Sequence, residues 1–94
     1  DDAASRTITD LEVDKLIQRL GNIGIEVTVD EASRAYISRK GYDPQYGARP
    51  LKRAVQTYLE DELGEILIED APQAGEVIRV TLREDTDKLL FTKA

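Results

Sequence analysis

The sequence predicts an α+β domain in which three helices pack with a small three-stranded sheet, in the chain order α-β-α-α-β-β. Apolar residues recur every three or four positions over 10–20 and 50–68, which is the period of an amphipathic helix. Apolar and polar residues alternate over 25–29, 77–82 and 88–92, which is the period of a strand with one buried face. Packing the helices on the sheet is the simplest way to bury every apolar face.

The first helix is expected over residues 10–20. Thr9 with Glu12 three positions later has the pattern of a capping box, and Gly21 is a suitable residue to end the helix. Its apolar stripe consists of Leu11, Val13, Leu16, Ile17 and Leu20.

A second helix is expected over residues 31–40, after the first strand. Asp30 precedes it as an N-cap, and Arg39 and Lys40 lie in its last turn, where cations suit the helix dipole. Gly41 is expected to end this helix.

The third helix, over residues 50–68, has the strongest amphipathic pattern. It follows a loop at 42–48, and Pro50 suits the first helical position because its missing N–H is not needed there. Gly64 is expected to mark a bend or a close contact. The apolar stripe consists of Leu51, Ala54, Val55, Tyr58, Leu59, Leu63, Ile66 and Leu67.

The last two strands are joined by a polar connection at residues 83–87, which suits a hairpin. The chain contains no Met and begins at Asp1, so we expect it to be a piece of a longer protein. Residues 1–7 have no periodic pattern and are expected to be a tail or a cut linker. Residues 8–94 then form one domain.

The composition excludes several classes of function. The chain has no Cys and no His, so it lacks thiol and imidazole catalysis and the usual zinc ligands. Its carboxylates are scattered, and Asp85 and Asp87 have no EF-hand spacing, so we expect no catalytic residues and no metal site. There is no phosphate-loop motif, membrane helix or signal peptide. A net charge of −6 argues against a nucleic-acid binder.

Positive charge is concentrated in one segment. Residues 34–53 carry six basic residues and one acidic residue, a net of +5, whereas residues 1–33 and 54–94 carry net charges of −5 and −6. A charge run is usually a solvated helix face, so the concentration alone does not define a function.

The start of the third helix is the strongest candidate site. Its free N–H groups form an anion site, and Arg49 and Lys52 add positive charge that the helix dipole would repel. A phosphate would attract both, with Gly47 allowing a tight turn and Pro50 fixing the first turn. The alternative is that Arg49 pairs with a carboxylate elsewhere in the domain.

The tyrosines are weaker candidates for a binding role. Tyr42 and Tyr46 flank Pro44 and are expected to pack the loop against the third helix, the alternative being a stack on a nucleobase. Tyr58 lies in the apolar stripe and is expected to belong to the core.

Residues 41–53, GYDPQYGARPLKR, closely resemble the sensor-2 segment in the second AAA+ module of Clp-type ATPases, the ClpB and ClpC unfoldases. The elements follow that family's C-terminal small subdomain in order over residues 8–92. The resemblance implies a lid beside a large subdomain, with ATP or ADP bound between them and Mg held by the large subdomain. Arg49, after Gly47 and Ala48 and near Lys52, would sense the phosphates.

The resemblance also implies a hexameric ring in the cytoplasm, in which the lid packs on a neighbouring subunit of an ATP-dependent chaperone or proteolysis machine. The isolated domain would need no cofactor and would not hydrolyse ATP, because the Walker motifs are absent from it. The sequence does not separate a ClpB-like disaggregase from a ClpC-like protein that docks a peptidase. The alternative function is a free-standing adaptor that binds acidic partners through residues 34–53, and an RNA-binding domain is disfavoured by the charge.

Overall fold

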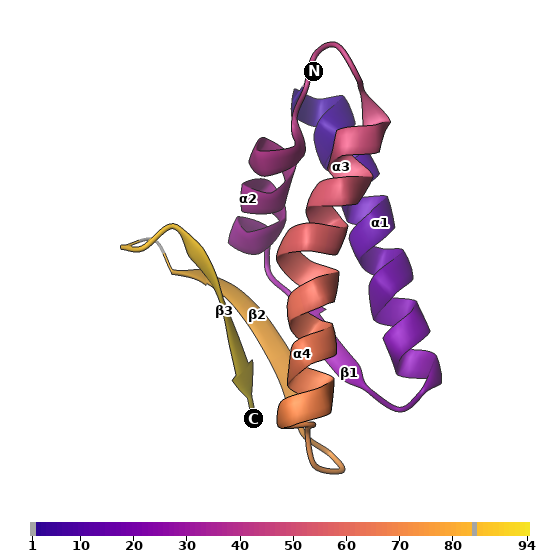
Figure 1. Ribbon diagram of the computed structural model, residues 1–94, viewed down its shortest axis with the longest axis vertical. Coiled ribbons are helices and arrows are strands. Elements are labelled where there is room, and N and C mark those ends of the chain that lie inside the picture. Colours follow the sequence, from indigo (N-terminus) through magenta and orange to yellow (C-terminus); the bar gives the residue numbers. More distant parts are fainter. Residues whose placement is uncertain (1, 84) are drawn as a thin grey trace.

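The computed structural model has two layers, with helices covering one face of a three-stranded sheet (Figure 1). It describes residues 2–83 and 85–94. The elements are α1 (Asp2–Asn22), β1 (Glu26–Val29), α2 (Glu31–Gly41), α3 (Ala48–Val55), η1 (Gln56–Glu60), α4 (Asp61–Glu69), β2 (Val77–Arg83) and β3 (Lys88–Lys93). The α+β class and the order of elements predicted from the sequence are confirmed. No helix in the described part of the chain is long and apolar enough to cross a membrane.

The sheet has the order β1-β2-β3, with β1 parallel and β3 antiparallel to the central strand β2. Val27 pairs with Ile78 across the parallel ladder, and Val80 pairs with Phe91 across the antiparallel ladder. These side chains face the helices, because alternate residues of a strand point to the same face. The core between the layers consists of Val13, Leu16, Val27, Val29, Tyr36, Ile37, Ala54, Val55, Leu59, Leu63, Ile78 and Val80.

Helix α1 begins at Asp2, so the expected start at residue 10 and the expected tail over residues 1–7 are wrong for the described residues; Asp1 lies outside them. Thr9 lies inside the helix rather than at its cap. It is fully buried, and its Oγ1 has no hydrogen-bond partner among the described residues. Ser5 is also buried. The N-terminal half of α1 is therefore held by its packing in the folded domain, which a local capping pattern does not reveal.

The end of α1 also differs from the expectation, since Gly24 and not Gly21 terminates it. Gly24 has φ of 84°, its N–H donates to Gly21 O at 3.0 Å, and the N–H of Ile25 donates to Leu20 O at 2.9 Å. These two bonds form a Schellman motif, in which glycine is favoured at the left-handed position. Leu11, expected in the apolar stripe, is 55% exposed.

The third predicted helix is one continuous helical rod, α3–η1–α4, with a π-helical turn in its middle. The expected close contact at Gly64 is absent among the described residues, because a Cβ built there meets nothing within 4 Å apart from the neighbouring backbone of its own helix. A π turn inserts an extra residue and so shifts the buried face. Leu51 and Ala54 before it and Leu63 after it are all buried, which shows that the shift keeps the rod's apolar side on the core.

The hairpin between β2 and β3 lies where the sequence predicted it. The N–H of Thr86 donates to Arg83 O at 3.2 Å, and Asp87 has φ of 50°. Glu84, part of the predicted connection, lies outside the described residues. The Nζ of Lys93 reaches back to Asp70 O at 3.0 Å and so satisfies a carbonyl after the end of α4.

Candidate functional site

The candidate site is the loop between α2 and α3 and the first turn of α3, at one end of the molecule (Figure 1). Gly41, the last residue of α2, is buried. A Cβ built on it would lie 2.9 Å from Pro50 O, from Leu51 Cα and from Ala54 Cβ. Two of these atoms are backbone, so only glycine allows α2 to approach α3 this closely.

Asp43 organises the loop itself. Its Oδ1 accepts hydrogen bonds from the N–H of Gln45 at 2.8 Å and from the N–H of Tyr46 at 3.3 Å. Its carbonyl accepts a bond from the N–H of Gly47 at 3.2 Å. A single aspartate followed by Pro44 therefore satisfies three donors in the loop, as an Asx turn does.

Helix α3 begins at Ala48, with Gly47 as its N-cap. Gly47 has φ of 63° and ψ of −119°, a conformation that side chains rarely adopt, and it supplies no side-chain cap. Pro50 is therefore the third helical residue, whereas the sequence analysis had predicted it to be the first. It still lies in the first turn, where a missing N–H breaks no helical bond.

Arg49 is exposed, and its side chain has no ion-pair or hydrogen-bond partner in residues 2–83 and 85–94. Among the carboxylates of the described residues, none forms the ion pair with Arg49 that the alternative interpretation requires. The first turn of α3 contains no acidic residue. The helix thus presents an arginine and uncapped N–H groups at the same end, and both attract an anion.

The other residues predicted for the site differ in their exposure and ion pairs. Ala48 and Gly47 are exposed. Lys52 is exposed but pairs with Glu12 at 3.7 Å, and Glu12 also pairs with Lys15 at 3.7 Å. Of the two predicted site cations, Arg49 has no ion pair in the described residues, whereas the charge of Lys52 is partly neutralised by Glu12 of α1.

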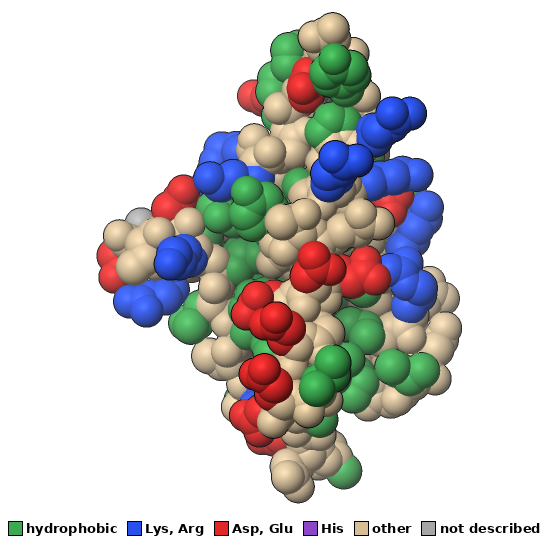
Figure 2. Space-filling model, in the orientation of Figure 1, with side chains coloured by type: hydrophobic (Ala, Val, Ile, Leu, Met, Phe, Trp, Pro, Cys, Tyr) green, Lys and Arg blue, Asp and Glu red, His purple; other side chains and the backbone are tan. Residues whose placement is uncertain are grey.

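Basic residues lie at the N-terminal end of the rod and acidic residues at its C-terminal end, which is the reverse of what the helix dipole favours. Helix α3 carries Arg49, Lys52 and Arg53 and no acidic residue, whereas α4 carries Asp61, Glu62, Glu65 and Glu69 and no basic residue. Figure 2 shows Lys and Arg side chains gathered over α3 and the adjoining part of α1, and acidic side chains along α4. A helix normally favours acidic residues at its start and basic residues at its end.

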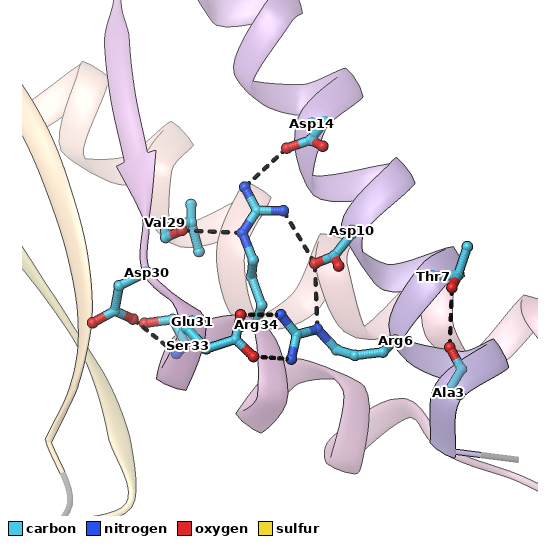
Figure 3. A network of polar contacts seen from close by, with 10 residues as sticks. All are labelled: Ala3, Arg6, Thr7, Asp10, Asp14, Val29, Asp30, Glu31, Ser33 and Arg34. Atoms are coloured by element: carbon cyan, nitrogen blue, oxygen red, sulfur yellow. Dashed lines mark hydrogen bonds and ion pairs between the residues drawn. The ribbon is translucent and has the colours of Figure 1, made fainter.

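The basic segment 34–53 does not form one continuous patch. Arg34 turns toward α1 and is engaged by Asp10 Oδ1 at 3.1 Å and Asp14 Oδ1 at 2.9 Å (Figure 3). Its Nε also donates to Val29 O at 3.0 Å. Burial lowers the pKa of Arg34, but the two aspartates outweigh burial and raise it, so this cation is fixed inside the domain.

A second arginine joins the same network. Arg6 donates to both carboxylate oxygens of Glu31, at 2.5 and 2.6 Å, and contacts Asp10 at 3.3 Å (Figure 3). The hydrogen bonds from Arg6 lower the pKa of the Glu31 carboxyl. The network ties the early part of α1, which the sequence analysis had taken for a tail, to the start of α2.

The tyrosines do not occupy the places expected of them. Tyr42 and Tyr46 are 45% and 63% exposed, so they do not pack the loop tightly against α3. Tyr58 is 37% exposed and makes an edge contact with buried Tyr36, with ring centroids 5.8 Å apart, so it lies at the border of the core. A groove of about 210 Å³ lies beside the loop and is lined by Ala4, Ser5, Ile8, Tyr42, Asp43, Pro44, Gly47 and Leu51.

Gly41 and Asp43 are the residues whose roles the sequence analysis missed. Gly41 had been interpreted only as a helix terminator. The signal for Asp43 was present, because Asp before Pro favours a turn that the aspartate side chain itself closes.

The profile of the family described as "C-terminal, D2-small domain, of ClpB protein" matches residues 1–80. The chain belongs to this family. It is a C-terminal small subdomain of the Clp ATPase type, as the segment GYDPQYGARPLKR indicated. Among the described residues, no three His, Cys, Asp or Glu side chains are grouped so as to hold a metal ion.

Individual relatives agree with the family. The domain is 38% identical to the chaperone protein ClpB of Agrobacterium fabrum over 84 residues, which is 89% of this chain and 9% of the relative. It is 39% identical to the ATP-dependent Clp protease ATP-binding subunit ClpC of Staphylococcus saprophyticus over 75 residues, 80% of this chain and 9% of that relative. It therefore spans about a tenth of the length of these relatives.

Proposed function

We propose that this domain is the lid of an ATP-dependent Clp-type protein unfoldase, in which Arg49 contacts the phosphates of a nucleotide bound between the lid and a large AAA+ subdomain. The observation that carries the proposal is the exposed Arg49 at an uncapped helix start, without a partner in the described residues. A phosphate placed there would accept from the guanidinium and from the first N–H groups of α3 together.

In this proposal, Arg49 at the start of α3 is tolerated without a nucleotide but gains a favourable contact when a phosphate is bound. Arg49 extends into solvent when the site is empty, so its repulsion by the dipole is weak. In a partly dehydrated cleft, a charge-assisted contact contributes about 1.5–3 kcal/mol. Because the contact depends on the phosphate state, its gain and loss would couple nucleotide hydrolysis to rotation of the lid.

The proposal includes assembly. Ile68, Ile23, Tyr46 and Leu11 are 86%, 69%, 63% and 55% exposed. The buried core of an interface is more apolar than the rest of a protein surface, so these exposed side chains support packing on the large subdomain and on a neighbouring subunit of a hexameric ring. In this proposal the large subdomain holds Mg, the full-length protein works in the cytoplasm, and docking of a peptidase is left to parts outside this domain.

The experiment is steady-state ATP turnover of the full-length protein carrying Arg49→Ala, Arg49→Lys or Arg39→Ala. We expect Arg49→Ala to lower turnover about ten- to a hundredfold, which corresponds to losing a contact of 1.5–3 kcal/mol from the transition state. Arg49→Lys should restore only part, because an ammonium lacks the planar fork. Arg39 is an exposed arginine near the end of α2 and serves as the matched control, with unchanged turnover.

Two results would contradict the proposal. One is Arg49→Ala with wild-type nucleotide affinity and turnover. The other is a loss of activity that follows a loss of folded protein in thermal unfolding of the same variant, which would make Arg49 a structural residue.

A further inference from the structure

We propose that Asp43 and Gly41 are positioning residues for Arg49, which together hold the first turn of α3 at a fixed place against the end of α2. The inference rests on the proposed role of Arg49 and adds to it the part of the domain that sets where the guanidinium lies. Neither residue is proposed to touch the nucleotide.

Arg49 needs such a device because nothing described in the domain holds its side chain. A partner carboxylate would fix a guanidinium directly, and Arg49 has none in residues 2–83 and 85–94. The position of its charge is then set by the backbone from which it extends. A misplacement of about 1 Å at a reacting centre can cost a hundredfold in rate, so the backbone at Arg49 must be held closely.

Asp43 fixes the approach to this backbone from the loop side. It accepts from the N–H groups of Gln45, Tyr46 and Gly47, the last through its own carbonyl. Gly47 lies between Asp43 and α3 and has φ of 63°. Glycine can adopt many backbone conformations, so an ordered loop is needed to hold it in this one. Without the Asp43 carboxylate, two of the three bonds that select it are lost.

Gly41 fixes the same backbone from the other side. Its Cα lies so close to α3 that a Cβ would be 2.9 Å from Pro50 O and from Leu51 Cα. Pro50 directly follows Arg49 in the first turn. Any side chain at position 41 must therefore push this turn away from α2, and Arg49 with it.

Asp43 and Gly41 lie seven and nine residues before Pro50 in sequence, and both act on the short connection between α2 and α3. Asp43 holds the loop, and Gly41 sets the distance between the helices. The start of α3 is consequently fixed relative to α2 without any contact from the Arg49 side chain, which stays available for its ligand.

The test uses the full-length protein with Asp43→Ala, Asp43→Asn, Gly41→Ala and Gly64→Ala, each in the wild-type and the Arg49→Ala background. We expect Asp43→Ala and Gly41→Ala to lower ATP turnover roughly three- to tenfold through misplacement of the arginine. Asp43→Asn should retain most activity, because the amide oxygen accepts the same N–H groups. Gly64→Ala is the matched control, since its Cβ meets nothing within 4 Å.

The decisive comparison is the Arg49→Ala background. If Asp43 and Gly41 act through Arg49, their substitutions should add almost nothing once Arg49 is removed, whereas independent effects would multiply. Hydrogen exchange of the peptide covering residues 42–48 should be faster in Asp43→Ala and near wild type in Asp43→Asn. This second readout does not depend on ATP turnover.

The outcomes separate the two proposals. If Arg49→Ala leaves turnover unchanged, the proposed sensor fails and the positioning role fails with it. If Arg49→Ala lowers turnover but Asp43→Ala and Gly41→Ala do not, or multiply its effect, the positioning role alone is overturned. Equal losses in Asp43→Asn and Asp43→Ala would also overturn it, because the carboxylate charge would then matter rather than the acceptor oxygen. Should Asp43→Ala fail to fold, Gly41→Ala and Asp43→Asn decide.

Discussion

The N-terminal ends of α2 and α3 are built in opposite ways, although the two helices are in close contact at Gly41. At α2, Asp30 accepts from the N–H of Ser33 at 2.8 Å, and Glu31 adds an acidic residue to the first turn. At α3, Gly47 provides no side-chain cap, and the first turn contains Arg49 and no acidic residue. The first start follows every preference of a helix N-terminus, and the second follows none of the electrostatic ones.

A cation lies near both starts, and its surroundings differ. Arg34 of α2 is neutralised by Asp10 and Asp14 from α1. Arg49 of α3 is exposed without a partner in the described residues. The chain therefore satisfies a cation within the domain where it serves the fold, and leaves one unsatisfied where the proposed ligand would complete it. This difference agrees with a stabilising role for the start of α2 and supports the binding role that we propose for the start of α3.

The largest effect on stability is expected from Arg34→Ala in the 94-residue chain. It removes bonds to Val29 O, Asp10 and Asp14 from a side chain that is only 17% exposed, and we expect a loss of about 2 kcal/mol in the free energy of unfolding. Arg53→Ala in α3 is the matched control, with a change within about 0.5 kcal/mol. Urea denaturation measures both, and equal losses would contradict the proposed contrast.

The next effect is expected from Asp30→Ala, which removes the cap of α2. The orphan N–H of Ser33 loses its acceptor, and we expect a loss of about 1 kcal/mol in unfolding free energy. Asp30→Ser keeps a capping oxygen and serves as the control with a smaller loss. An Asp30→Ala variant as stable as wild type would mean that the cap contributes nothing to the fold.

The elements predicted well from the sequence are those with local signals. The Asp30 cap is confirmed, and the strands begin and end within one residue of their expected positions because alternation and turn residues act over short distances. The place of Arg49 near the start of the rod was also predicted, since Pro50 marks the first turn of a helix.

The elements predicted poorly depend on contacts between distant segments. The early part of α1 is helical because Ser5 packs in the interior and Arg6 bonds to Glu31, 25 residues away. The π turn at Gln56–Glu60 arises where the rod must keep its apolar face on the core, which a straight-helix pattern cannot show. Gly41 looks in sequence like any helix-ending glycine, and only the approach of α3 reveals its steric role.

A smaller, pH-dependent effect is expected at the start of α2 from the pair of Arg6 and Glu31. The pKa of Glu31 is lowered in the folded chain, so the pair stabilises the fold above the ordinary glutamate range, and its contribution is lost as the pH falls through the lowered value. The difference in urea midpoint between wild type and Glu31→Gln should therefore be present at about pH 7 and disappear at a lower pH, once the pH has fallen below the ordinary glutamate range and through the lowered pKa of Glu31. A difference that persists unchanged at the lower pH would exclude the ionised pair as its source.

The smallest effect, and the only one of opposite sign, is expected from Arg49→Gln. Removing a cation from the first turn of α3 relieves its repulsion by the helix dipole, and no described contact is lost, so the 94-residue chain should gain about 0.3 kcal/mol. The gain should shrink as salt is raised from about 0.01 to 0.5 M, because exposed charges are screened. Arg39→Gln near the end of α2 provides the contrast, since a cation suits that end of a helix and its removal should not stabilise. A salt-dependent gain in stability, together with reduced ATP turnover of the same variant in the full-length protein, would show that Arg49 is held against the preference of its own helix for a ligand from outside the domain. A loss of stability would instead reveal that Arg49 has a favourable contact within the fold.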